Sequence, residues 1–242
     1  MTANAKYFRW ILCLTALLSL SAVTAQQQAK EFNDCAIEKL SAHDSLAAIE
    51  YFTRVIDVNP GDSMAYFDRA FIRQNMGDYP GALADYTRQI AVDRYSTDSY
   101  FLRGLLKIKL KDYSGAIKDL DRVTELEPSN VDAFYNRGLA KAALSDWQSA
   151  MVDYDQALAM NPNHPEALVS RAQAKEKLKD LKGALGDYDH AIEVDPQNMQ
   201  YYLYRAEFKL KAGEKKQACS DLSIYRSMGG IVTSNELTEM CK

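Results

Sequence analysis

One pattern recurs along this chain every 34 residues, and no other feature restricts the fold as strongly. From residue 29 to residue 232, six copies follow one another without insertion or deletion. They start at Ala29, Ser63, Thr97, Val131, Pro165 and Met199, and their position 20 is always alanine: Ala48, Ala82, Ala116, Ala150, Ala184 and Ala218. A fixed period of this length is typical of stacked supersecondary units that contact only their neighbours. The sequence therefore predicts one elongated array.

Each copy predicts two helices. In the copy 131–164, small and apolar residues recur at helical spacing over 132–144 and again over 147–160. Pro162 stops the second segment, and three other copies have a proline at the same position. The second copy has Arg94 there, which predicts a longer helix or a looser junction. Each copy is expected to be a helical hairpin.

An acidic residue precedes every second helix, where a carboxylate can cap the backbone N–H groups and favour the positive helix end. These residues are Asp44, Asp78, Asp112, Asp146, Asp180 and Glu214. We expect all six to cap a helix.

The copies resemble the tetratricopeptide repeat. With Val131 as position 1, the characteristic residues at positions 4, 8, 20, 24, 27 and 32 are Phe134, Gly138, Ala150, Tyr154, Ala157 and Pro162. The resemblance covers nearly all of the chain after residue 28. It implies an all-α, right-handed α-solenoid of six helix-turn-helix repeats (29–62, 63–96, 97–130, 131–164, 165–198 and 199–232), and we expect a short capping helix over 233–242.

The same resemblance implies a protein-interaction scaffold that binds its partner in a concave groove. In the family, positions 5, 9 and 12 of the first helix line this groove. Here they include Phe67, Phe71, Gln74, Phe101, Leu105, Ile108, Tyr135 and Leu139, and then turn polar at Gln173 and Glu176. Such an apolar groove suits a helical or extended segment with large side chains rather than a C-terminal carboxylate. The alternative is that the aromatic residues only pack against their neighbours.

Copies two to six share an arginine at position 7 and an aspartate at position 23, whereas the first copy has Cys35 and Tyr51. Because the two charges occur together or not at all, we predict ion pairs between the two helices, either within a copy or across the junction to the next. The predicted pairs are Arg69–Asp85, Arg103–Asp119, Arg137–Asp153, Arg171–Asp187 and Arg205–Asp221. A ligand-binding row of arginines is the alternative.

Residues 1–25 differ in kind from the repeats. Lys6 and Arg9 precede an apolar run and then small residues up to Ala25, which is typical of a secretory signal peptide; an uncleaved anchor is the alternative. Removing these two cations from 29 basic residues leaves 27 against 33 acidic residues, a net charge of −6. This charge argues against a nucleic acid or an anionic membrane as partner. We expect an exported protein, periplasmic or secreted, without stable membrane insertion after cleavage.

No motif for catalysis, a metal or another cofactor is found, and the three histidines stand at different repeat positions. The chain is therefore predicted not to be an enzyme. Two other functions stay open: a structural or self-associating subunit of a cell-envelope complex, and a module that binds glycan or peptidoglycan.

The cysteines fit an exported chain. After signal cleavage Cys35, Cys219 and Cys241 remain, and an oxidising compartment favours disulfides. A terminal helix folded back over the last hairpin would bring Cys241 near Cys219, so we predict this disulfide; two buried free thiols are the alternative. The ending also resembles the C-termini of exported tetratricopeptide proteins of Gram-negative, Bacteroidetes-like bacteria.

Overall fold

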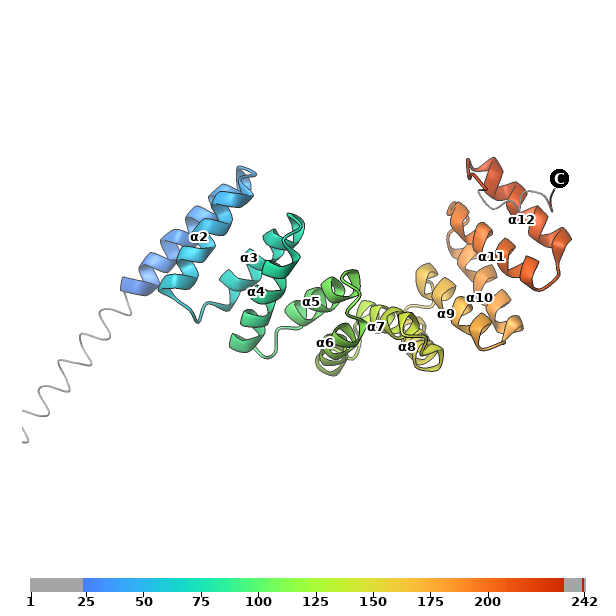
Figure 1. Ribbon diagram of the computed structural model, residues 1–242, viewed down its shortest axis with the longest axis horizontal. Helices are drawn as coiled ribbons and strands as arrows, with labels where there is room; N and C mark the ends of the chain where they lie inside the picture. Colours follow the sequence, from blue (N-terminus) through green and yellow to red (C-terminus); the bar gives the residue numbers. More distant parts are fainter. Residues whose placement is uncertain (1–23, 233–240, 242) are drawn as a thin grey trace, which may run out of the picture. The chain divides into compact units, whose positions relative to one another are not determined.

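The computed structural model describes residues 24–232 and residue 241. The predicted signal peptide therefore lies almost entirely outside the described residues, as does the predicted capping helix except for Cys241. All regular secondary structure in the described part of the chain is helical (Figure 1). The prediction of an all-α array of helical repeats is confirmed.

First and second helices alternate along the chain, after a helix over residues 24–41. The first helices are α3 (Ser63–Asn75), α5 (Thr97–Lys109), α7 (Val131–Ala143), α9 (Pro165–Lys177) and α11 (Met199–Lys211). The second helices are α2 (Ser45–Val58), α4 (Tyr79–Val92), α6 (Tyr113–Leu126), α8 (Trp147–Met160), α10 (Leu181–Val194) and α12 (Lys215–Ser227).

The second copy does not have the longer helix that its missing proline predicts. Helix α4 has 14 residues, as α2 and α6 do. The backbone N–H of Asp93 still donates to the carbonyl of Gln89 at 2.7 Å, and the Asp93 carboxylate accepts the N–H of Tyr95 at 3.0 Å. This aspartate turn ends the helix without proline, because an Asp side chain can bond to its own backbone two residues on.

The acidic residues cap five of the six second helices. Asp112, for example, accepts the backbone N–H of Gly115 at 3.0 Å, and Asp44, Asp78, Asp146 and Asp180 do the same at their helices. Glu214 makes no side-chain bond of this kind, so the prediction of six caps is wrong for the last helix. A glutamate carries one more methylene group than an aspartate, and aspartate is the preferred N-cap.

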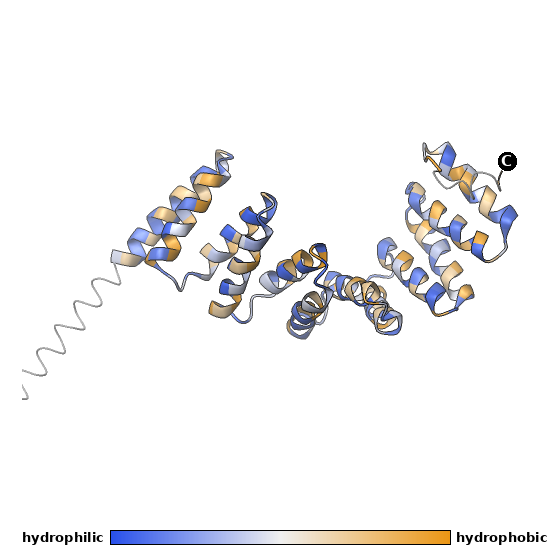
Figure 2. Ribbon diagram, in the orientation of Figure 1, coloured by the Kyte–Doolittle hydropathy of each residue, from blue (hydrophilic) through white to orange (hydrophobic). Residues whose placement is uncertain are grey.

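The described residues form two compact units, one up to Leu106 and one from Lys107 onward, which we call the N-terminal unit and the C-terminal unit. Within each unit, consecutive helices contact each other. Hydrophobic residues recur at intervals along each helix among hydrophilic ones (Figure 2). This amphipathic pattern lets a helix bury one side against its neighbours. None of the helices within residues 24–232 is both long and apolar enough to span a bilayer.

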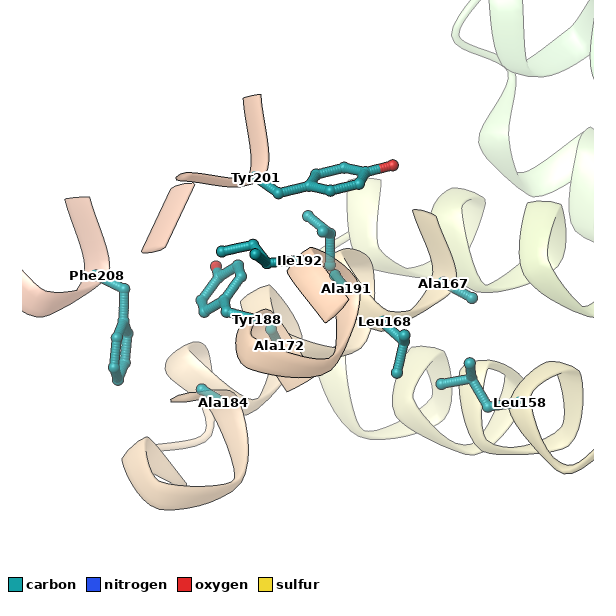
Figure 3. Close-up of a cluster of buried hydrophobic side chains, with 11 residues drawn as sticks. Leu158, Ala167, Leu168, Ala172, Ala184, Tyr188, Ala191, Ile192, Tyr201 and Phe208 are labelled. Carbon is teal, nitrogen blue, oxygen red and sulfur yellow. The ribbon is translucent and has the colours of Figure 1, made fainter. Parts of the chain in front are cut away.

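Tyrosines at position 24 form the centre of the C-terminal unit's core. Figure 3 shows Tyr188 close to Ala172, Ala184 and Ile192, and its ring centroid lies 5.7 Å from that of Phe208. In the preceding copy, a Cβ atom at Gly138 would overlap the ring of Tyr154. The small residue at position 8 thus makes room for the tyrosine ring of the second helix.

Candidate functional site

The arginine at position 7 joins two copies. Arg137 donates from Nε and Nη2 to the two carboxylate oxygens of Asp153, at 3.0 and 2.6 Å, within its own copy. Its Nη1 donates to Asp121 and to Thr124 of the preceding copy, both at 2.8 Å. The sequence left open whether the arginine pairs within its copy or across the junction between two copies. Arg137 makes both contacts.

The same arrangement recurs where the two partners lie in one unit. Bidentate pairs form at Arg69–Asp85, Arg171–Asp187 and Arg205–Asp221, and their Nη1 atoms donate to Thr53, Asp155 and Asp189. Arg103 lies in the N-terminal unit, where it donates to Thr87, and Asp119 lies in the C-terminal unit, where it accepts from Lys107.

These charges are enclosed by the protein. The side chain of Asp153 is 1% exposed, and Lys141 lies 2.7 Å from its second oxygen. Burial opposes the charge of Arg137, but the hydrogen bonds and negative charges of Asp153 and Asp121 outweigh it and raise the pKa of its guanidinium. Carboxylates of the protein itself hold the arginine, so we assign it a structural role.

The predicted groove residues divide between the two units. In the N-terminal unit, Phe71 is 45% exposed, whereas Phe67 is partly buried with its ring centroid 6.1 Å from that of Tyr86. Gln74 lies close to the hydroxyl of the same tyrosine, at 3.5 Å, and Phe101 and Leu105 are partly exposed. Of these predicted groove residues, Phe71 alone is among the exposed large hydrophobic side chains.

In the C-terminal unit, Ile108 and Leu139 are partly exposed. Tyr135 packs between two rings, with centroid distances of 6.2 Å to Tyr154 and 5.0 Å to His164. Burial, more than any neighbouring charge, raises the pKa of its phenol. The packing alternative therefore describes Tyr135 better than the groove prediction does.

A pocket that the sequence did not predict lies within the C-terminal unit. Its volume is about 430 Å³, and helices α8 to α11 and the turn between α9 and α10 supply its walls. The lining residues are Trp147, Gln173, Glu176, Lys177, Lys179, Tyr188, Tyr204, Glu207 and Lys211. Gln173 and Glu207 stand at position 9 and Glu176 at position 12, the polar end of the predicted groove. The sequence did not indicate that Trp147 and the lysines contribute to this site, because they do not stand at the groove positions 5, 9 and 12.

Glu176 is a partly enclosed charge in this pocket, with its side chain 16% exposed. It accepts a hydrogen bond from the hydroxyl of Tyr188 at 2.5 Å, and Lys211 reaches its other oxygen at 3.4 Å. Burial, then Glu176 and then Glu207, raise the pKa of the Tyr188 phenol well above its usual value. Lys177 lies over the indole of Trp147, 5.7 Å from the ring centroid.

At the C-terminal end, the structure joins Cys219 of α12 to Cys241, with their Cα atoms 5.4 Å apart. Cys35 is a free, partly buried thiol.

In the described residues, no group of His, Cys, Asp and Glu side chains could hold a metal ion.

Three family models match the middle of the chain. One, described as TPR repeat, matches residues 104–145, and two described as Tetratricopeptide repeat match residues 131–164 and 165–198. The chain is a tetratricopeptide repeat protein. The last two matches coincide with the fourth and fifth 34-residue copies. A search of curated protein sequences finds no significant match.

Solved structures of tetratricopeptide repeat proteins share the fold. Pseudomonas aeruginosa pilF is 19% identical, with a TM-score of 0.67 over 89% of this chain and 97% of its own. A tetratricopeptide repeat protein from Parabacteroides merdae is 18% identical, with a TM-score of 0.66 over 89% and 98%. YrrB, described as a TPR protein with an unusual peptide-binding site, is 20% identical, with a TM-score of 0.64 over 78% and 95%. At sequence identities of 18–20%, these similarities show a shared fold alone.

Proposed function

We propose that this tetratricopeptide repeat protein is a non-enzymatic scaffold that binds a segment of a partner protein. The binding surface is formed by the side chains at positions 5, 9 and 12 of the first helices, which we call the first-helix surface. The observation that carries the proposal is the pocket of about 430 Å³, because residues at these positions of α9 and α11 line it.

The same repeat positions in the N-terminal unit provide a second, independent observation. Phe71, at position 9 of α3, keeps 45% of its surface in solvent although its neighbours Ala70 and Ile72 are buried. A partner side chain that covered this ring would gain apolar burial, and aromatic residues often anchor protein interfaces. The peptide-binding site named for YrrB concerns a protein of the same fold, so a peptide-like ligand is compatible with this architecture.

We further propose that the chain works outside the cytoplasm, in the periplasm or secreted. The proposal rests on the signal-like residues 1–25 and on the proximity of Cys219 and Cys241, since stable disulfides form in oxidising compartments.

Site-specific crosslinking in the native organism tests the scaffold function. A photo-crosslinking amino acid replaces Phe71 on α3 or Gln173 on α9, and as controls it replaces Leu46 on α2 or Val152 on α8. Both controls are exposed apolar residues of second helices, 69% and 53% exposed. We expect the first two positions to capture a partner protein that the controls do not capture.

Two outcomes would contradict the proposal. Equal capture at all four positions would show that the first-helix surface has no special role. Crosslinks only to further copies of this chain would favour a self-associating structural subunit instead.

A further inference from the structure

We propose that the pocket of the C-terminal unit binds an arginine side chain of the partner segment, with acidic residues flanking that arginine. This inference rests on the proposed function and adds the chemistry of the partner. Its basis is the arrangement of charge in the pocket: the enclosed polar groups are acidic or phenolic, and the basic groups are exposed.

Two carboxylates line the pocket together with Tyr188. Glu176 accepts a hydrogen bond from the Tyr188 hydroxyl at 2.5 Å, and Glu207 is the other carboxylate of the lining. Glu207 has no hydrogen-bond or ion-pair partner among residues 24–232. An unpaired carboxylate beside an enclosed one creates a negative region that favours a cation.

The cation that now contacts Glu176 is weakly held. Lys211 lies 3.4 Å from the carboxylate, and its side chain is 70% exposed. An exposed pair at this distance contributes little, so a better donor can displace the lysine at low cost. Lys177, placed over Trp147, is an exposed residue as well.

A guanidinium fits this pocket better than an ammonium does. It presents five N–H donors in a plane, so it can bond to both Glu176 and Glu207, and it stacks on aromatic rings. The pocket lining supplies such rings at Trp147 and Tyr204. A volume of about 430 Å³ leaves room for the long side chain and part of the adjoining backbone.

The exposed lysines indicate the residues next to the arginine. Lys177, Lys179 and Lys211 line the pocket and are all exposed to solvent. After the arginine displaces Lys211 from Glu176, this lysine is available for a carboxylate of the partner. An arginine between two aspartates therefore complements both the acidic interior and the basic surroundings.

Blocked pentapeptides test the proposal on the full chain. The probe has the sequence Asp-Ala-Arg-Ala-Asp, and three matched peptides replace the arginine by its neutral isostere citrulline, by lysine or by glutamate. The chain carries Trp10→Phe, so that Trp147, the other of its two tryptophans, alone reports binding by fluorescence. Isothermal calorimetry gives the dissociation constants.

We expect the arginine peptide to bind roughly tenfold or more tightly than the citrulline peptide, because citrulline lacks the charge that strengthens the hydrogen bonds. Glu207→Gln is expected to weaken arginine binding by a similar factor, whereas Glu207→Asp keeps most of it. Glu193→Gln, an exposed glutamate of α10 outside the pocket lining, is expected to change nothing. Melting temperatures establish that each variant is folded.

Equal affinities of the arginine and citrulline peptides, no binding of any peptide, or tighter binding of the glutamate peptide would overturn the inference. The scaffold function is judged separately. If the crosslinker at Gln173 captures a partner protein and Glu207→Gln leaves that capture unchanged, the scaffold stands and the arginine site does not.

Discussion

At the scale of the residue, the arginine at position 7 connects three side chains with one planar group. Arg137 holds Asp153, whose side chain is 1% exposed, and Asp121, whose side chain is 45% exposed. Removing one partner of an enclosed ion pair leaves a charge without compensation, whereas an exposed pair contributes little. The ion pair with Asp153 should therefore contribute more to the free energy of unfolding than the pair with Asp121, although their distances to the arginine are similar.

Two double-mutant cycles measure this difference. We expect Arg137→Leu to lower the free energy of unfolding by about 1–3 kcal/mol, because Asp153 loses its bidentate partner and keeps only Lys141. The coupling energy with Asp153→Asn should be about 2 kcal/mol, and that with Asp121→Asn below about 1 kcal/mol. Urea denaturation of the four variants in each cycle gives these values. Equal couplings would show that burial does not set the strength of the pair.

Buried tyrosines make the protein sensitive to alkaline pH. Burial raises the pKa of Tyr201 to about 12, and it raises those of Tyr86, Tyr154 and Tyr188 further, from an ordinary value of 10.0. Above pH about 10 the unfolded chain loses these protons and the folded chain does not, so stability falls as the pH rises from there. Tyrosinate absorbance should therefore rise together with the loss of helical circular dichroism. Full ionisation of the tyrosines in a chain that stays helical would contradict this prediction.

The sequence predicted part of this residue-level structure. Copies two to six have both an arginine at position 7 and an aspartate at position 23, which indicated an ion pair because burying an unpaired charge is costly. The second contact of each arginine was not predictable, since its acceptor at position 25 changes from Thr53 and Thr87 to Asp121, Asp155 and Asp189 along the copies. Tyr135 was assigned to the groove because position 5 alone does not reveal how deeply a ring is packed.

At the scale of the element, every hairpin turn contains a residue in the left-handed backbone region. The residue at position 15 has φ between 59° and 85° in all six copies. Glycine occupies it only in Gly77 and Gly213; the other copies have His43, Lys111, Ser145 and Lys179. Side chains with a Cβ atom are disfavoured there, so these four turns carry local strain. In the sequence, the two glycines at position 15 were the indication that this position has a positive φ.

Ser145→Gly should relieve this strain. We expect it to raise the free energy of unfolding by about 0.5–1 kcal/mol, because glycine adopts a positive φ without steric cost. The matched control is Ala143→Gly, two residues earlier at the exposed end of α7, which should lower stability by up to about 1 kcal/mol. Urea denaturation of both variants measures these changes in the free energy of unfolding. Destabilisation by Ser145→Gly would show that the serine side chain contributes more than the strain costs.

At the scale of the whole molecule, the period predicted the repeats because each copy needs its neighbours to bury its apolar side. It did not predict the pocket of the C-terminal unit. That pocket combines residues from Trp147 to Lys211, which four helices bring together from different repeat positions. A repeat pattern describes what the copies share, whereas this site depends on where they differ.

The structure pairs Cys219 of α12 with Cys241, and the effect of this disulfide on stability can be measured. With a sequence separation of 22 residues, it should stabilise the folded chain by about 3 kcal/mol through the reduced entropy of the unfolded chain. Cys219→Ser should lower stability by this amount, and reductant should then have no further effect. Cys35→Ser serves as the control and should be neutral. Mass spectrometry of non-reduced peptides from the native compartment must find the linked pair; both thiols alkylated before reduction would exclude it.

The most direct measurement concerns the partner protein captured at Phe71. Its dissociation constant is compared for Phe71→Ala and for Leu46→Ala, exposed apolar residues on a first and on a second helix, 45% and 69% exposed. We expect Phe71→Ala to weaken binding roughly tenfold or more and Leu46→Ala to leave it unchanged, with similar melting temperatures for both. Equal affinities of the two variants would contradict binding at the first-helix surface.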